Sequence, residues 1–89
     1  MIQAHIFYSG KIQGVGFRYT VKSFAKECSV VGWVKNLENG KVELVAEGEE
    51  KQINKLCQLV EEQFEGFIVD KKMTTERPQG KFTNFQVIY

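Results

Sequence analysis

The sequence predicts an α+β sandwich, in which two helices cover one face of a mostly antiparallel sheet. Stretches with a period of two residues alternate with two stretches of helical period. Their order along the chain is β-α-β-β-α-β, with an additional strand or strand extension after the second helix, which is the order of ferredoxin-like folds. The 89 residues suffice for one domain, residues 1–89, and no repeat or linker divides them.

The first strand and both helices follow from the spacing of their apolar residues. Residues 2–9 alternate between apolar and polar, the pattern of a half-buried strand, and the glycine-rich stretch 10–16 ends it. The first helix is predicted from about residue 17, with an apolar stripe at Val21, Phe24, Ala25 and Cys28. The second has its apolar face at Ile53, Leu56, Cys57, Val60 and Phe64. Gly66 suits its C-terminus, where a left-handed residue often closes the last turn.

A β-hairpin is predicted between the two helices. Its first strand covers Val30 to Leu37, and the second alternates from Val42 and stops at Gly48. Asn39-Gly40 between them predicts a type I′ turn, in which both central residues have positive φ. After the second helix, residues 67–77 form a less regular strand. Pro78 to Gly80 then turn, and Phe85 to Tyr89 form the last strand.

Composition excludes several classes of protein. With 43% hydrophobic and 26% charged residues, the chain is not of the disordered type. Its net charge of +1 and the lack of a basic cluster argue against a nucleic-acid partner. No secretory signal is present, and no run approaches the ~18 apolar residues that span a bilayer. We therefore expect a cytoplasmic protein without membrane contact, whose Cys28 and Cys57 are buried free thiols.

The loop between the first strand and the first helix is a candidate phosphate site. Gly10, Gly14 and Gly16 allow successive backbone N–H groups to turn toward one point. The helix start adds unpaired N–H groups and the positive end of its dipole. Arg18 at the helix entrance can bind two phosphate oxygens at once. The glycine spacing fits neither a dinucleotide fingerprint nor a nucleotide P-loop, and such a loop is also typical of an ordinary strand–helix connection.

Asn36, near the end of the strand that enters the hairpin, is a second candidate. Its carboxamide both donates and accepts hydrogen bonds, so it can hold a water molecule in a defined orientation. An asparagine at this place can equally cap the turn.

Together these segments resemble the two signatures of the acylphosphatase family. The first signature, G-x-V-Q-G-V-x-F-R, is matched by Gly10 to Arg18 with Ile12 in place of valine. The second, G-[aromatic]-V-[K/R]-N-x-x-x-G-x-V-x-x-x-x-x-G, is matched by Gly32 to Gly48. The resemblance extends over nearly the whole chain, and the family's fold agrees with the predicted order of elements.

The resemblance implies a hydrolase that cleaves the carboxyl–phosphate anhydride of an acylphosphate, of the acetyl, carbamoyl, glyceroyl or aspartyl type, to a carboxylate and inorganic phosphate. It implies no metal and no cofactor. A monomer is the default expectation, because nothing in the sequence indicates an oligomer. Arg18 would bind the phosphate and Asn36 would position the attacking water. The backbone amides of a phosphate-binding loop would complete the site: Gln13, Gly14, Val15, Gly16, Phe17 and Arg18. His5 is not expected to act as a base, and the carboxylate of Tyr89 is a weaker candidate for orienting Arg18.

Two alternatives remain open from the sequence. The same fold occurs as a non-catalytic module that binds phosphate or carbamoyl phosphate within larger proteins. RNA-binding sheets also share the β-α-β-β-α-β order, but they need exposed aromatic residues on central strands and basic surroundings. Phe7, Phe82 and Phe85 are available for such a role, whereas residues 41–47 contain no aromatic residue.

Overall fold

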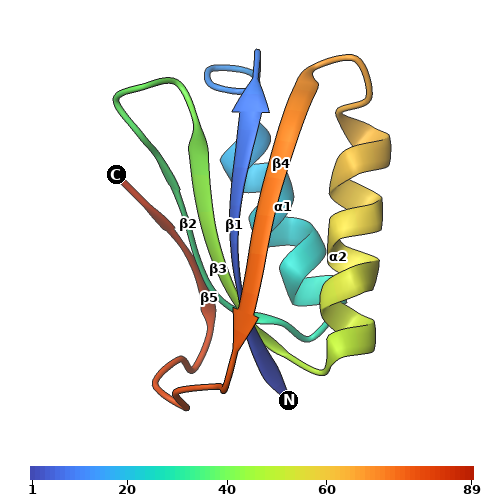
Figure 1. The fold of residues 1–89 in the computed structure, drawn as a ribbon, viewed down its shortest axis with the longest axis vertical. Helices are drawn as coiled ribbons and strands as arrows, with labels where there is room; N and C mark the ends of the chain where they lie inside the picture. Colours follow the sequence, from blue (N-terminus) through green and yellow to red (C-terminus); the bar gives the residue numbers. More distant parts are fainter.

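The computed structural model describes residues 1–89 and confirms the predicted order of elements (Figure 1). The additional segment after the second helix is a separate strand, so the sheet has five strands. The elements are β1 (Ile2–Gly10), α1 (Phe17–Glu27), β2 (Val31–Asn36), β3 (Val42–Gly48), α2 (Glu50–Gln63), β4 (Ile68–Glu76) and β5 (Phe85–Ile88). The fold is therefore α+β and ferredoxin-like.

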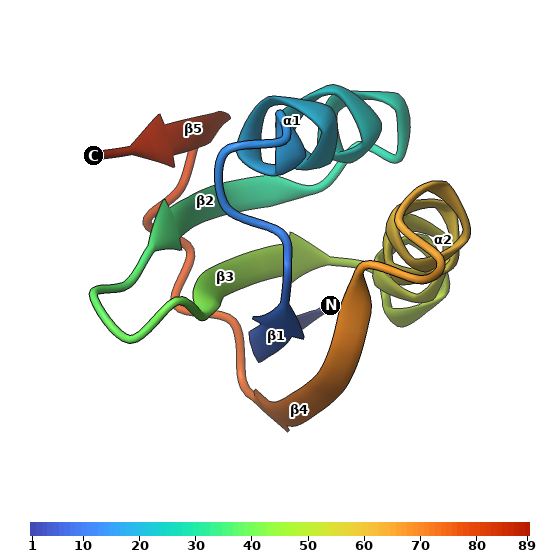
Figure 2. The same cartoon turned by 90° about the horizontal axis from the view of Figure 1, so that it is seen from above.

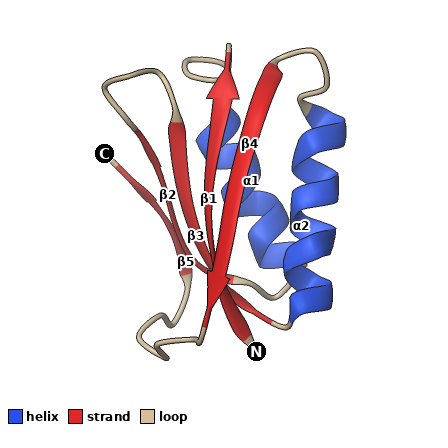
Figure 3. Cartoon of the chain, in the orientation of Figure 1, coloured by secondary structure: helices blue, strands red, loops and turns tan.

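The strand order across the sheet is β4-β1-β3-β2-β5. Both β1 and β2 are antiparallel to β3, which lies between them, while β4 is antiparallel to β1. The pairing of β5 with β2 is the only parallel one (Figure 3). As a consequence β1, β2 and β5 run in the same direction, and their carboxyl ends meet at one edge of the sheet.

Both helices cover the same face of the sheet (Figure 2). The alternation in β1 places Ala4, Ile6 and Tyr8 on this face, and all three are fully buried. The stripes expected on the helices face the sheet, and they supply half of the remaining core: Val21, Ala25, Cys28, Ile53, Leu56, Cys57, Val60 and Phe64. Both cysteines are free and buried, as expected.

The predicted hairpin is present, but its predicted turn type is wrong. Gly40 has a φ of +88°, whereas Asn39 is not left-handed, since Ser29 is the only non-glycine residue with positive φ. The N–H of Gly40 donates to the carbonyl of Leu37 at 3.2 Å. The side chain of Asn39 instead accepts a hydrogen bond from the N–H of Lys41 at 3.0 Å. The loop therefore has three residues and ends in a left-handed glycine, so only one residue needs positive φ.

Several predicted boundaries shift by one residue. The strand expected from Val30 to Leu37 is β2, Val31–Asn36, and the last strand ends at Ile88 rather than at Tyr89. The strand expected over 67–77 covers Ile68–Glu76. Gly66 lies in the turn after α2, which ends at Gln63, and its φ of +88° serves that turn rather than the last turn of the helix.

Candidate functional site

The two predicted site residues lie at the edge of the sheet where β1, β2 and β5 end and α1 begins (Figure 1). Arg18, on the first turn of α1, and Asn36, the last residue of β2, line one hollow of about 250 Å³. The other lining residues are Ile12, Gly14, Gly16, Phe17 and Tyr19. Two segments that are 18 positions apart in the sequence thus share one small site.

The loop backbone alternates in handedness before the helix. Gly14 has a φ of +81° and Gly16 a φ of +79°, and the non-glycine residue between them, Val15, has a negative φ. Such alternation points successive N–H groups to one side and forms a concave site for an anion. No side chain caps the start of α1, and its first turn contains no acidic residue. The N–H groups at the helix start are therefore available to a bound anion.

Arg18 is held from the side by the end of β5. Its Nη1 donates to the carbonyl oxygen of Ile88 at 3.2 Å. Its Cζ lies 4.7 Å from the centroid of the Tyr89 ring. Arg18 belongs to none of the three ion pairs, so it forms no ion pair with the carboxylate of Tyr89, the weaker candidate for orienting it. A guanidinium has five N–H donors, and the remaining ones can serve a phosphate.

Asn36 contains an unusual atom. Its Oδ1 is buried and has no hydrogen-bond partner. No other side-chain nitrogen or oxygen of the protein is buried without a partner. A buried acceptor without a donor is unfavourable, and such an atom calls for an explanation. Turn capping does not provide one, because the cap of this hairpin comes from Asn39. The oxygen instead belongs to a residue that lines the same hollow as Arg18.

The loop residues differ in how they contribute. Gly14, Gly16, Phe17 and Arg18 line the hollow, whereas Gln13 and Val15 do not. The carboxamide nitrogen of Gln13 donates to two carbonyl oxygens of the hairpin, that of Leu37 at 2.8 Å and that of Lys41 at 3.0 Å. Its side chain thus ties the loop to the hairpin next to Asn36, a role that the sequence analysis missed.

Phe17 anchors the start of α1 in the core. Its side chain is 2% exposed, and its ring centroid lies 5.8 Å from that of Tyr8 and 4.8 Å from that of Phe64. The hydroxyl of Tyr8 donates to Oε2 of Glu61 at 2.7 Å. Burial raises the pKa of Tyr8, so this hydroxyl stays neutral and acts as a donor. The packing fixes the helix end of the loop.

Tyr19 was also missed by the sequence analysis. It lines the hollow next to Arg18, yet its side chain is 55% exposed. One signal was present in the sequence: Tyr19 is a large aromatic residue that falls outside the apolar stripe of its helix. The contact of Ile88 with Arg18 had no such signal, and Tyr89 was considered only for its carboxylate and not for the contact of its ring with Arg18.

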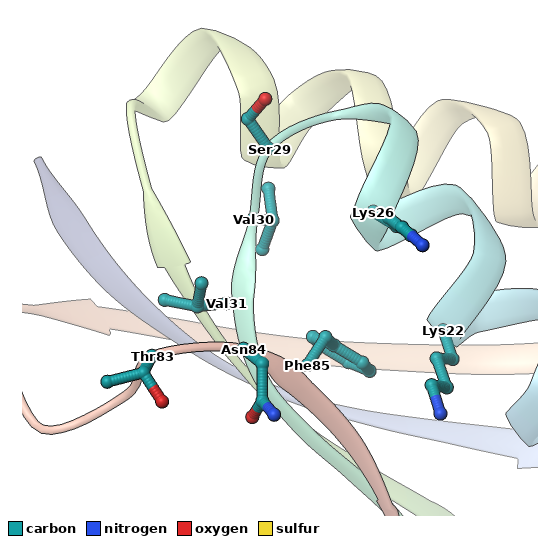
Figure 4. Close-up of a pocket in the computed structure, with 8 residues that line it drawn as sticks. All are labelled: Lys22, Lys26, Ser29, Val30, Val31, Thr83, Asn84 and Phe85. Carbon is teal, nitrogen blue, oxygen red and sulfur yellow. The ribbon is translucent and has the colours of Figure 1, made fainter.

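The second hollow and His5 lie outside the site of Arg18 and Asn36. A larger hollow of about 500 Å³ lies between the later turns of α1 and the starts of β2 and β5 (Figure 4), and shares no lining residue with the hollow of Arg18. His5 hydrogen-bonds to Oε2 of Glu43 at 2.7 Å, and neither residue lines the site.

No three His, Cys, Asp or Glu side chains lie close enough together to hold a metal ion. Neither helix combines the length and the apolar character that crossing a membrane requires.

The fold and the hollow define a small ferredoxin-like protein with a glycine-rich strand–helix loop beside Arg18 and Asn36. The family model for Acylphosphatase matches residues 4–87. An acylphosphatase of Roseiflexus sp. (strain RS-1) is 39% identical over 92 residues, which cover 100% of this chain and 97% of the relative. The crystal structure of acylphosphatase from Bacillus subtilis has a TM-score of 0.92 at 35% identity, and the match covers 100% of both chains. An acylphosphatase structure from Coxiella burnetii has a TM-score of 0.86 at 36% identity, over 97% of this chain and 90% of the other.

The chain therefore belongs to the acylphosphatase family. It is a hydrolase that acts on acid anhydrides, and the family implies an acylphosphate as its substrate.

Proposed function

We propose that Arg18, Asn36 and the loop amides hydrolyse acylphosphates without a metal ion or a cofactor. The observation that carries this proposal is the buried oxygen of Asn36, which has no hydrogen-bond partner and belongs to a residue that lines the hollow beside the loop. An oxygen in that place can accept a hydrogen bond from a water molecule and so orient it toward the phosphorus.

Phosphate binding is assigned to the loop and Arg18. The positive φ values of Gly14 and Gly16 and the uncapped start of α1 favour N–H groups that converge on one site, and no acidic residue lies in the first turn of the helix. Arg18 adds a permanent positive charge, and its bond to the carbonyl of Ile88 orients the guanidinium before substrate arrives. Donors fixed in advance stabilise the charge that spreads over the phosphoryl oxygens in the transition state.

The chemical step requires neither a general acid nor a general base from the protein. The water oxygen forms a bond to phosphorus, and the bond between phosphorus and the acyl oxygen breaks in line with it. The carboxylate leaves as a stable anion and therefore needs no general acid. One water proton passes to a phosphoryl oxygen, because no carboxylate, imidazole or amine that could accept it lines the hollow. The products are a carboxylate and inorganic phosphate.

The test is hydrolysis of acetyl phosphate by the wild-type protein, Arg18→Ala and Asn36→Ala in excess EDTA. Arg18→Ala should raise KM, lower kcat and weaken binding of inorganic phosphate, since the group contacts the phosphate before and during the reaction. Asn36→Ala should lower kcat by about 100-fold and leave phosphate binding within a few-fold. In ¹⁸O-labelled water, the label should appear in the phosphate and not in the acetate.

Three results would contradict the proposal. Label in the acetate would show attack on the carbonyl carbon. Turnover that EDTA abolishes would show that a metal ion takes part. A folded wild-type protein that binds phosphate but turns over no acylphosphate would favour the binding module that the sequence left open.

A further inference from the structure

Exposed apolar side chains gather around the phosphate hollow. Six large hydrophobic residues of the protein are exposed: Met1, Val15, Tyr19, Phe67, Val69 and Tyr89. Tyr19 lines the hollow itself, and Tyr89 stacks on Arg18. Val15, 47% exposed, lies between the two lining glycines of the loop. We call Val15, Tyr19 and Tyr89 the apolar rim.

The apolar rim has no evident part in binding the phosphate. Scattered exposed apolar residues are common on protein surfaces, but three of the six in this protein line or adjoin one site. Phosphate needs N–H donors and positive charge, which the loop and Arg18 supply. The valine side chain and the face of the Tyr19 ring can supply neither.

The in-line geometry of the displacement directs the acyl group toward this rim. The water and the leaving group lie on opposite sides of the phosphorus in an in-line displacement. The proposed water is held by Oδ1 of Asn36, which is buried. The acyl group must therefore extend away from Asn36, toward the exposed side of the hollow, and Tyr19 is the exposed apolar residue that lines it.

We infer that Val15 and Tyr19 determine specificity and favour acylphosphates with an extended apolar acyl group. The inference rests on the proposed function, because it takes the direction of the acyl group from the in-line reaction. The aromatic ring of Tyr19 offers a large contact area with few rotatable bonds, so little entropy is lost when it packs against an acyl chain. Tyr89 contributes to the same rim, but its contact with Arg18 makes it unsuitable for a clean test.

The experiment compares kcat/KM for acetyl phosphate and hexanoyl phosphate. Both have an unbranched alkanoic acid as leaving group, so their intrinsic reactivity is similar and they differ mainly in apolar length. A fully enclosing pocket discriminates by roughly 10-fold or more for each methylene. A rim that contacts one side of the chain gives less, and we expect hexanoyl phosphate to be favoured about 10-fold in total.

Variants separate specificity from structure. Tyr19→Ala should reduce the ratio of the two kcat/KM values to about threefold or below, whereas Tyr19→Phe should keep it. A purely structural role of Tyr19 would lower both values together and leave the ratio unchanged. Val69→Ser is the matched control, since Val69 is 80% exposed on β4 and does not line the hollow.

The outcomes distinguish the inference from the proposed function. Equal kcat/KM values for the two substrates, or a ratio that survives Tyr19→Ala, overturn the specificity role and leave the hydrolysis intact. Failure of the wild-type protein to hydrolyse either substrate overturns the proposed function and the specificity role together.

Discussion

Replacement of Asn36 by alanine removes Oδ1, the one buried side-chain oxygen or nitrogen that has no hydrogen-bond partner. Leaving such a group unsatisfied costs a protein about 1–3 kcal/mol. Part of this cost is recovered whenever water enters the hollow, and alanine loses some packing of a half-buried side chain. We therefore expect the free energy of unfolding of Asn36→Ala to equal that of the wild type or to exceed it by up to ~1 kcal/mol.

The expected effect on the reaction has the opposite sign. Loss of the atom that orients the water should lower kcat by about 100-fold, or ~2.7 kcal/mol of transition-state stabilisation. The measurements are urea unfolding, thermal unfolding and steady-state hydrolysis of acetyl phosphate. A gain of ~1 kcal/mol would raise Tm by roughly 4–8 °C for a domain of this size.

Asn39→Ala is the matched control in the same hairpin. The side chain of Asn39 is exposed and accepts a hydrogen bond from Lys41, so its loss should destabilise the fold by about 0.5–1 kcal/mol and leave kcat unchanged. If Asn36→Ala instead lowers Tm by several degrees, the oxygen has a structural partner in the folded protein. A kcat within about threefold of the wild type would refute the positioning of water by Asn36.

Two further predictions concern a buried carboxylate and the phosphate-binding loop. Glu47 is 3% exposed and accepts hydrogen bonds from Gln3 (2.7 Å), from the N–H of Gln79 (2.6 Å) and from that of Gly80 (3.2 Å). Burial alone would raise the pKa of Glu47, but these bonds bring it below its ordinary value. The charged form therefore stabilises the fold above the unfolded pKa, and this contribution is lost as pH falls through the folded pKa. Glu47→Gln should cost about 1–2 kcal/mol in urea unfolding near pH 7 and much less near pH 3, and an equal cost at both would contradict the role of the charge. Gln13→Ala should lower Tm slightly and kcat several-fold, because the loop loses its two bonds to the hairpin; its kcat would stay at the wild-type value if the loop were rigid without them.

Local patterns in the sequence determined the elements and half of the site. Strand and helix periods arise from which residues face the core, so they can be read from spacing alone. Glycines at positions 14 and 16 and the arginine at position 18 are neighbours in the chain. Their N–H groups and charge therefore come together whatever the rest of the fold does. The type of the hairpin turn was not determined in this way, because the side chain of Asn39 competes with the left-handed backbone that its sequence favours.

The surroundings of Asn36 and Arg18 were decided only by the tertiary structure. Asn36 reaches the loop because β3 pairs with both β1 and β2, which brings the ends of those two strands to one edge of the sheet. Ile88 and Tyr89 reach Arg18, 70 or more positions away, because β5 adds in parallel to β2. The choice of pairing partner depends on contacts between distant segments, which leave no pattern within either segment. For the same reason, the burial of one unpartnered oxygen beside a phosphate loop could be found in the folded chain and not in its sequence.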